Sequence, residues 1–256
     1  MPGSIPDVHP GTWPIAAEAV VGIPLLVAGY ALTQLRWPSS TSRRLAFALA
    51  VALLVAAFAT PVHTIALHYL LSAHLFQNVV TAEWASGLTV VGISPALAER
   101  LERFAPVRAV THPLVALPVW LATYYTWHVP WIYDGALTHL HSVLHVEHAT
   151  YFVAGMLMWW PIVQGRWSDG IKALYLFGAF LLASPLGLLL ALLPDPVYGF
   201  YKHAPHLWVG HLTDQQIAGL SMAVEEAIVF FGVFAFYLGR FLRHEAIVGA
   251  FTESRR

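Results

Sequence analysis

The sequence predicts an all-α, polytopic membrane protein with seven transmembrane helices. Hydrophobic residues make up 58% of the 256 residues and charged residues only 11%, and the mean hydropathy is +0.64. Apolar runs recur along the whole chain, and about 20 apolar residues allow a helix to cross a bilayer. These runs are continuous, without the alternation of barrel strands, which favours helices that satisfy their own backbone groups in lipid.

The first three predicted spans cover residues 15–35, 43–61 and 64–92. The first span ends at "RWPSSTSRR", where proline, serine and arginine interrupt the apolar run. "TPVH" separates the second span from the third, and "ERLERFAPVR" follows the third. Proline removes a backbone donor and disfavours continuation of a helix, so these stretches mark linkers.

Four further spans are predicted over residues 113–130, 141–163, 171–193 and 214–240. The stretches "VPWIYDG", "QGRWSDG" and "LPDPVYGFYKHAPHLW" separate them and are rich in proline, glycine and polar residues. No internal repeat or low-complexity linker divides the series. Residues 1–256 are therefore predicted to form a single domain.

The basic residues predict the orientation of the chain. With seven spans, consecutive linkers alternate between the two sides, and all Lys and Arg residues except Lys202 fall on one side. Cationic linkers are retained in the cytoplasm, so we expect the N-terminus outside and the C-terminus in the cytoplasm. The cytoplasmic set is Arg36, Arg43, Arg44, Arg100, Arg103, Arg108, Arg166, Lys172, Arg240, Arg243, Arg255 and Arg256.

Histidine is distributed just as unevenly. Of the 14 histidines, only His112 and His244 belong to the predicted cytoplasmic side. Ionisable groups inside a membrane span are costly and usually functional, so the remaining histidines point to a site in the outer half. They are His9, His63, His68, His74, His128, His139, His141, His145, His148, His203, His206 and His211.

The fifth predicted span carries three of these histidines on one face. At 100° per residue, His141, His145 and His148 fall within about 60° of one another. His148 lies roughly 10 Å deeper than His141 at the helical rise per residue. Glu147 is placed among them, in the stretch "LHVEH".

Other spans bring polar side chains to the same level. We expect His63, His74 and Asn78 to share a face of the third span, with His74 the deeper histidine. The fourth span ends at His128, and the seventh begins at Asp214. Four spans are thus expected to converge on a pocket that opens to the outside.

Copper suits these donors best. Neutral imidazole binds copper, zinc, iron and nickel, and among divalent ions the affinity peaks at copper, so zinc and iron rank below it. Met222, about 12 Å below the start of the seventh span, would add a thioether for Cu(I). The predicted ligands are His74, His128, His141, His145, His148 and Met222.

These residues also have structural interpretations. Interfacial histidines often bond backbone carbonyls or bridge helices, and Met222 could serve packing alone. Glu147 or Asp214 could orient a ligating ring from outside the ligand set, and Asp214 could also cap a helix N-terminus. The bridging role is expected for His9, His139, His203, His206 and His244.

Three acids lie deeper in the predicted spans. Glu83 lies on the third span, and Glu225 and Glu226 lie on the seventh. Carboxylates near the midplane should face the bundle interior, protonated or paired. They could form a proton or cation path through Glu83 and Glu225, or a buried hydrogen bond between helices.

Four motifs in order resemble the cytochrome c oxidase assembly factors of the CtaG type, which are bacterial seven-helix membrane proteins. The motifs are "AHLFQN", "WHVPWIYDGAL", "VEHATYFVAGMLMWWPI" and "DQQIAGLSM", spread over about residues 70–240. The resemblance implies a role in oxidase maturation, with copper delivery to the oxidase, in the bacterial plasma membrane. The implied partners are an oxidase subunit or a copper donor protein.

Carried over by position, the family motifs place Gln77 and Asn78 beside the ligands. The family pattern is H-x-x-Q-H, and its second histidine is Asn78 here, an amide that binds metal more weakly. His63, His68 or His145 could substitute, or the site could be altered. The matching positions are His74, Gln77, His128, Pro130, Tyr133, Asp134, Glu147, His148, Trp160, Pro161, Asp214, Gln215, Gln216, Gly219 and Met222.

Three functions follow from these observations. The first is a non-enzymatic assembly factor that binds copper from the outer side and supports its insertion into the oxidase. The second is a transporter of copper or another metal ion, which would need ligands continuing to the cytoplasmic side, where only carboxylates lie. The third is an intramembrane metalloenzyme with Glu147 as the general base, although "HVEH" matches neither common zinc-protease motif. A net charge of −1 gives no indication of nucleic-acid binding.

Overall fold

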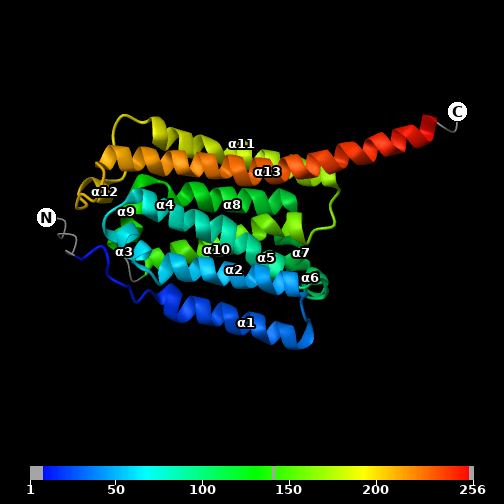
Figure 1. The fold of residues 1–256 in the computed structure, drawn as a ribbon, viewed down its shortest axis with the longest axis horizontal. Helices are drawn as coiled ribbons and strands as arrows, with labels where there is room; N and C mark the ends of the chain where they lie inside the picture. The colour runs from blue at the N-terminus through cyan, green and yellow to red at the C-terminus, as the bar shows by residue number, and fades with distance from the viewer. Residues whose placement is uncertain (1–7, 140–141, 254–256) are drawn as a thin grey trace.

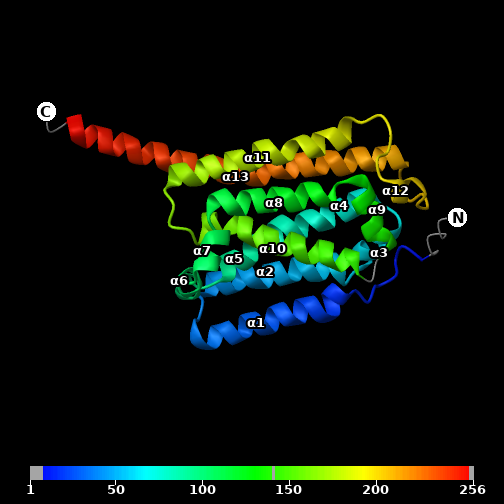
Figure 2. The same cartoon turned by 180° about the vertical axis from the view of Figure 1, so that it is seen from behind.

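The computed structural model describes residues 8–139 and 142–253, and these residues form a bundle of helices (Figure 1). Short helices close the bundle at both ends, and Figure 2 shows the same order of helices from behind. The elements, with η for a π-helix, are η1 (Glu18–Gly22), α1 (Ile23–Arg36), α2 (Thr41–Phe58), α3 (Pro61–His68), α4 (Leu71–Val79), η2 (Val80–Ala85), α5 (Ser86–Gly92), α6 (Pro95–Glu102), α7 (Ala105–Val110), α8 (Pro113–Trp127), α9 (Pro130–Thr138), α10 (Val143–Val163), α11 (Asp169–Leu192), α12 (Gly199–Lys202) and α13 (His211–Glu253).

The all-helical class predicted from the sequence is confirmed over the described residues. Four helical stretches among them are long and apolar enough to cross a membrane, and they coincide with predicted spans. α8 and α10 are part of the bundle and occupy two further predicted positions. The four stretches are Glu18–Arg36, Thr41–Phe58, Asp169–Leu192 and His211–Ile247.

The prediction of one unbroken helix over residues 64–92 is wrong. Tyr69 and Leu70 leave the helical conformation, and Leu70 is extended with ψ of 122°. The backbone N–H groups of Leu71 and Ser72, at the start of α4, donate instead to the carboxylate of Asp214. An acceptor from a distant helix therefore compensates for the break, and no proline or glycine marks it in the sequence.

This break also corrects the expected arrangement of His63, His74 and Asn78 on one helical face. His63 lies on α3, whereas the other two lie on α4. In a straight helix His63 and Gln77 would be about 21 Å apart. The turn brings their side chains to 2.8 Å.

The linkers at the two ends contain more helix than predicted. Pro130 starts α9 at the first helical position, where its missing N–H has no partner to lose. α9 buries Tyr133 and Leu137 against the bundle. The stretch "VPWIYDG", predicted as a linker, is thus largely helical. α13 also continues past residue 240, the predicted end of its span, and its whole length is about 64 Å.

The two ends of the bundle differ in composition. The α1–α2 turn, α6, α7 and the far end of α13 lie at one end, whereas α3, α9 and α12 lie at the other (Figure 1). The predicted cationic linkers therefore gather at the first end, the arginine end, and most histidines at the second, the histidine end.

Candidate metal centre

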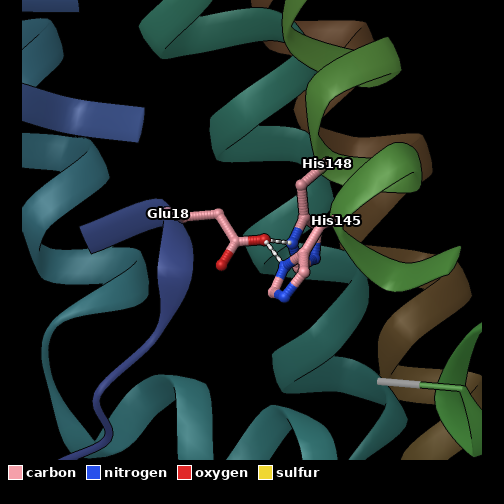
Figure 3. A group of neighbouring side chains, drawn as sticks. All are labelled: Glu18, His145 and His148. Atoms are coloured by element: carbon pink, nitrogen blue, oxygen red, sulfur yellow. Dashed lines mark hydrogen bonds and ion pairs between the residues drawn. The ribbon is translucent and has the colours of Figure 1, made fainter. Parts of the chain in front are cut away.

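A carboxylate and two imidazoles meet near the histidine end of the bundle. The Nδ1 atoms of His145 and His148, on α10, each lie 2.7 Å from Oε1 of Glu18 on η1 (Figure 3). One ligand atom from each residue lies within 4.8 Å of the others, which allows all three to bind one metal ion. The shared face predicted for His145 and His148 is confirmed, while His141 lies outside the described residues.

Glu18 was not among the residues predicted for the site. It is the only charged residue in the first predicted span, at residues 15–35, and that isolation was the available signal. Its partner segment α10 lies far away in sequence, so only the packing of η1 against α10 shows what Glu18 contacts.

His148 is surrounded by further histidines. Its ring centroid lies 6.2 Å from that of His63 and 6.1 Å from that of His74, and Phe58 packs edge-on at 4.8 Å. Gln77 Nε2 approaches His63 Nδ1 at 2.8 Å. Burial is the largest cause that lowers the pKa of His63, to about 4, so its ring is neutral at neutral pH.

A second polar layer lies beside this group. Asn78 donates to Glu147 Oε1 at 2.9 Å, and His74 Nε2 lies 3.7 Å from the same oxygen. The hydroxyl of Tyr201, on α12, lies 3.0 Å from His74 Nδ1. All these side chains are buried, so Asn78 acts here as a hydrogen-bond donor that holds Glu147 next to His74.

His128 and Met222 lie elsewhere. Both line a small cavity among buried residues, together with Asn78, Glu83 and Tyr124, whereas His145 and His148 line a larger pocket. His128 Nδ1 bonds the carbonyl of Tyr124 at 2.8 Å. The structure thus divides the five predicted ligands that it describes: two lie beside Glu18, His74 lies next to them, and His128 with Met222 lies apart.

Asp214 and Gln77 also have definite places. Asp214 accepts from Leu71 N at 2.7 Å and from Ser72 N at 3.1 Å, and it is buried. Asp214 therefore caps the start of α4. The sequence predicts instead that it caps its own helix or orients a metal ligand. Gln77 contacts His63 and donates to the carbonyl of Ala57 at 3.3 Å, which ties α4 to α2.

The chain matches one known protein family. Residues 24–244 match Caa3_CtaG, described as the cytochrome c oxidase caa3 assembly factor. The chain belongs to the Caa3_CtaG family. No curated protein and no solved structure matches it. Membership in Caa3_CtaG confirms the resemblance found in the four motifs and places the protein among oxidase assembly factors.

A pocket of about 430 Å³ adjoins the candidate centre of this Caa3_CtaG protein. Glu18, His145 and His148 line it together with Thr81 of η2, and the other lining residues are apolar ones of η1, α1, α2 and α10 and the segment before η1. Within the described chain, His148 Nε2 and Glu18 Oε2 are buried and lack a hydrogen-bond partner. Free donor atoms beside a pocket suit the uptake of a cation better than a purely structural hydrogen bond.

Proposed function

We propose that this protein binds copper at Glu18, His145 and His148 and supports its insertion into the caa3-type oxidase. The observation that carries the proposal is the meeting of two imidazole nitrogens and a carboxylate oxygen within 4.8 Å. Copper is the cargo in this proposal. The family membership supports the oxidase as its destination.

The donor set fits copper. Imidazole and carboxylate ligands bind Cu(II), and copper lies at the top of the affinity order for divalent first-row ions. Each ring also has a second nitrogen, and the carboxylate fixes the orientation of both rings. Zinc and iron would fit the same atoms with lower affinity.

The neighbouring buried side chains support the centre. His63 and His74 lie next to His148. Gln77 contacts the ring of His63, and Asn78 holds Glu147 next to the ring of His74. A neutral imidazole such as His63 can accept a hydrogen bond or a metal. We propose that His63 and His74 receive copper from Glu18, His145 and His148 or complete its coordination.

The apolar helices and the charge distribution support a location in the membrane. We propose that α1, α2, α4–η2–α5, α8, α10, α11 and α13 span a bacterial plasma membrane. The histidine end would then face outward, because the arginine end carries the residues retained in the cytoplasm. Copper would reach the centre from the outer side, where a donor protein or the oxidase subunit docks.

The decisive experiment measures bound copper. The triple variant Glu18→Gln, His145→Ala, His148→Ala should bind copper more than about tenfold more weakly than the wild type, because losing even a supporting group of a metal site costs 10–100-fold. Elemental analysis after copper loading and desalting gives the stoichiometry. His203→Ala is the matched control, since His203 is exposed and its ring bonds only the carbonyl of Gly199 in the described structure.

Two outcomes would contradict the proposal. Full copper binding by the folded triple variant would show that Glu18, His145 and His148 do not bind the copper. The triple variant could also lose copper binding while cells that carry it as their sole copy keep the normal copper content of the oxidase. That result would show that oxidase assembly does not need the centre. Oxidase copper content and activity in such cells are the second measurement.

A further inference from the structure

A cluster of carboxyl groups lies in the middle of the bundle, separate from the proposed copper centre. Glu83 projects from η2, and Glu225 and Glu226 project from α13. Trp84 Nε1 donates to Glu225 at 2.5 Å, and the hydroxyl of Tyr124 donates to Glu226 at 2.8 Å. The second oxygen of each carboxyl group is buried and, within residues 8–139 and 142–253, has no hydrogen-bond partner.

Three negative charges so close together would be unstable in a membrane interior. Trp84, the chain neighbour of Glu83, donates to Glu225, and Tyr124, which lines a cavity together with Glu83, donates to Glu226, so the three carboxyl groups are close neighbours. Neighbouring carboxyl groups in a site of low polarity cannot all be ionised. Glu225 also lines a hollow on the side of the bundle whose other lining residues are mostly apolar. A charge facing lipid there would be costly. The cluster therefore needs bound protons or a bound cation.

A small cavity lined by buried residues lies next to Glu83 and indicates whether the cluster holds protons or a cation. The space open to the centre of a water molecule is about 10 Å³, close to the least that one water requires. Glu83, Tyr124, Asn78 and His128 line it, and the described neighbours leave Asn78 Oδ1 and His128 Nε2 without partners although both residues are buried. Free polar atoms of Asn78 on α4, Glu83 on η2 and His128 just after α8 surround a water-sized space, and an ordered water needs two to four such partners.

The cluster is closed toward the arginine end. Phe230, about one turn beyond Glu226 on α13, packs between Trp120 and Trp159 with centroid distances of 5.5 and 5.9 Å. All three rings are buried. On the opposite side, His128 lies 3.3 Å from the hydroxyl of Tyr151 and joins the layer of tyrosines near the histidine end. Among the described residues, the polar contact of this cavity thus runs toward the histidine end, whereas three packed aromatic rings lie on the arginine side.

We propose that Glu83, Glu225 and Glu226 form a proton-binding site that exchanges protons with the histidine end through a water held by Asn78, Glu83 and His128. Uptake places one proton on a carboxylate oxygen and removes one negative charge. Release returns the proton to the cavity water. The aromatic layer of Trp120, Trp159 and Phe230 prevents passage to the arginine end, so the site stores a proton and does not conduct it across the bilayer.

Infrared spectroscopy of metal-free protein in liposomes tests the site independently of copper binding. The wild type should show a carboxylic acid C=O band at neutral pH that shifts to lower frequency in D₂O. Glu83→Gln and Glu226→Gln should each lose intensity in this band, and two variants guard against misfolding of one. Glu99→Gln is the control, because Glu99 is exposed and pairs with Arg166, and it should keep the full band.

A cavity-filling variant tests the water. Val79→Ile adds one methylene at the cavity wall, so the fast phase of hydrogen–deuterium exchange of the acid band should be lost while the band itself stays. Unchanged fast exchange in the folded variant would overturn the role of the cavity water.

Three results would overturn the storage site itself. The first is the absence of an acid band in the wild type at neutral pH. The second is a band that disappears on adding sodium or potassium ions, which would show a cation site. The third is a proton leak into dye-loaded liposomes by the wild type that Glu83→Gln abolishes, which would show conduction across the aromatic layer.

Discussion

Single side chains tie distant parts of this protein together at its histidine end. Asp214 caps α4 from α13, Asp134 accepts from the backbone of Gly199 and Phe200 at the start of α12, and Gln215 accepts from Val197 N at 2.6 Å. These residues belong to the family motifs, and in the structure their side chains bond backbone groups. These three motif residues therefore stabilise the fold through hydrogen bonds to backbone N–H groups.

Asp214 provides the clearest test of such a role. Asp214→Ala leaves the buried N–H groups of Leu71 and Ser72 without an acceptor, which should lower the free energy of unfolding by about 1–3 kcal/mol. Unfolding in mixed detergent micelles, followed by circular dichroism, measures the loss. Asp195→Ala, at an exposed position in the linker between α11 and α12, should have almost no effect, and equal stability of the two variants would contradict the capping role.

At the scale of elements, the close approach of α10 to η2 positions His145 and His148 of the candidate centre. A Cβ atom on Gly155 would lie 1.8 Å from the carbonyl oxygen of Ala82, so no larger residue fits without moving a helix. This contact is two turns along α10 from His148, and it fixes the height and rotation of the histidine face. A glycine in the middle of an apolar span is thus required by the helix packing.

Gly155→Ala should therefore destabilise the fold by about 1–3 kcal/mol through overpacking and displace α10. The displacement should also weaken copper binding at His145 and His148, although Gly155 contacts neither. Unfolding and copper titrations report the two effects. Gly178→Ala is the matched control, because its new Cβ meets no atom closer than 3.7 Å, and alanine favours the helix by roughly 0.5–1 kcal/mol.

The break between α3 and α4 has a similar consequence. Without it, His63 would lie far from Gln77 and from the candidate centre. The conformation of Tyr69 and Leu70 is set by Asp214 and by the hydroxyl of Tyr201, which donates to the carbonyl of Ala66 at 2.5 Å. A local sequence pattern contains no information about either partner, which explains the wrong prediction of a continuous helix.

For the whole molecule, the separation of the arginine end from the histidine end predicts one orientation. A periplasmic alkaline phosphatase fused after Arg256 should be inactive, because the C-terminus is expected in the cytoplasm. The same reporter inserted after Ala204, between α12 and α13, should be active. Activity at Arg256 with inactivity at Ala204 would reverse the proposed topology and place the candidate copper centre on the wrong side for an outer donor.

The sequence by itself determined the helical class, the approximate positions of the long helices, the separation of basic residues from histidines, and the family. These properties depend on composition and local periodicity, which a linear pattern contains. Only the tertiary structure decided which donors meet, because Glu18 joins His145 and His148 through the packing of distant helices, while His128 and Met222 face another cavity. Side-chain convergence depends on helix rotation, height and breaks, and contacts between residues far apart in the chain set all three.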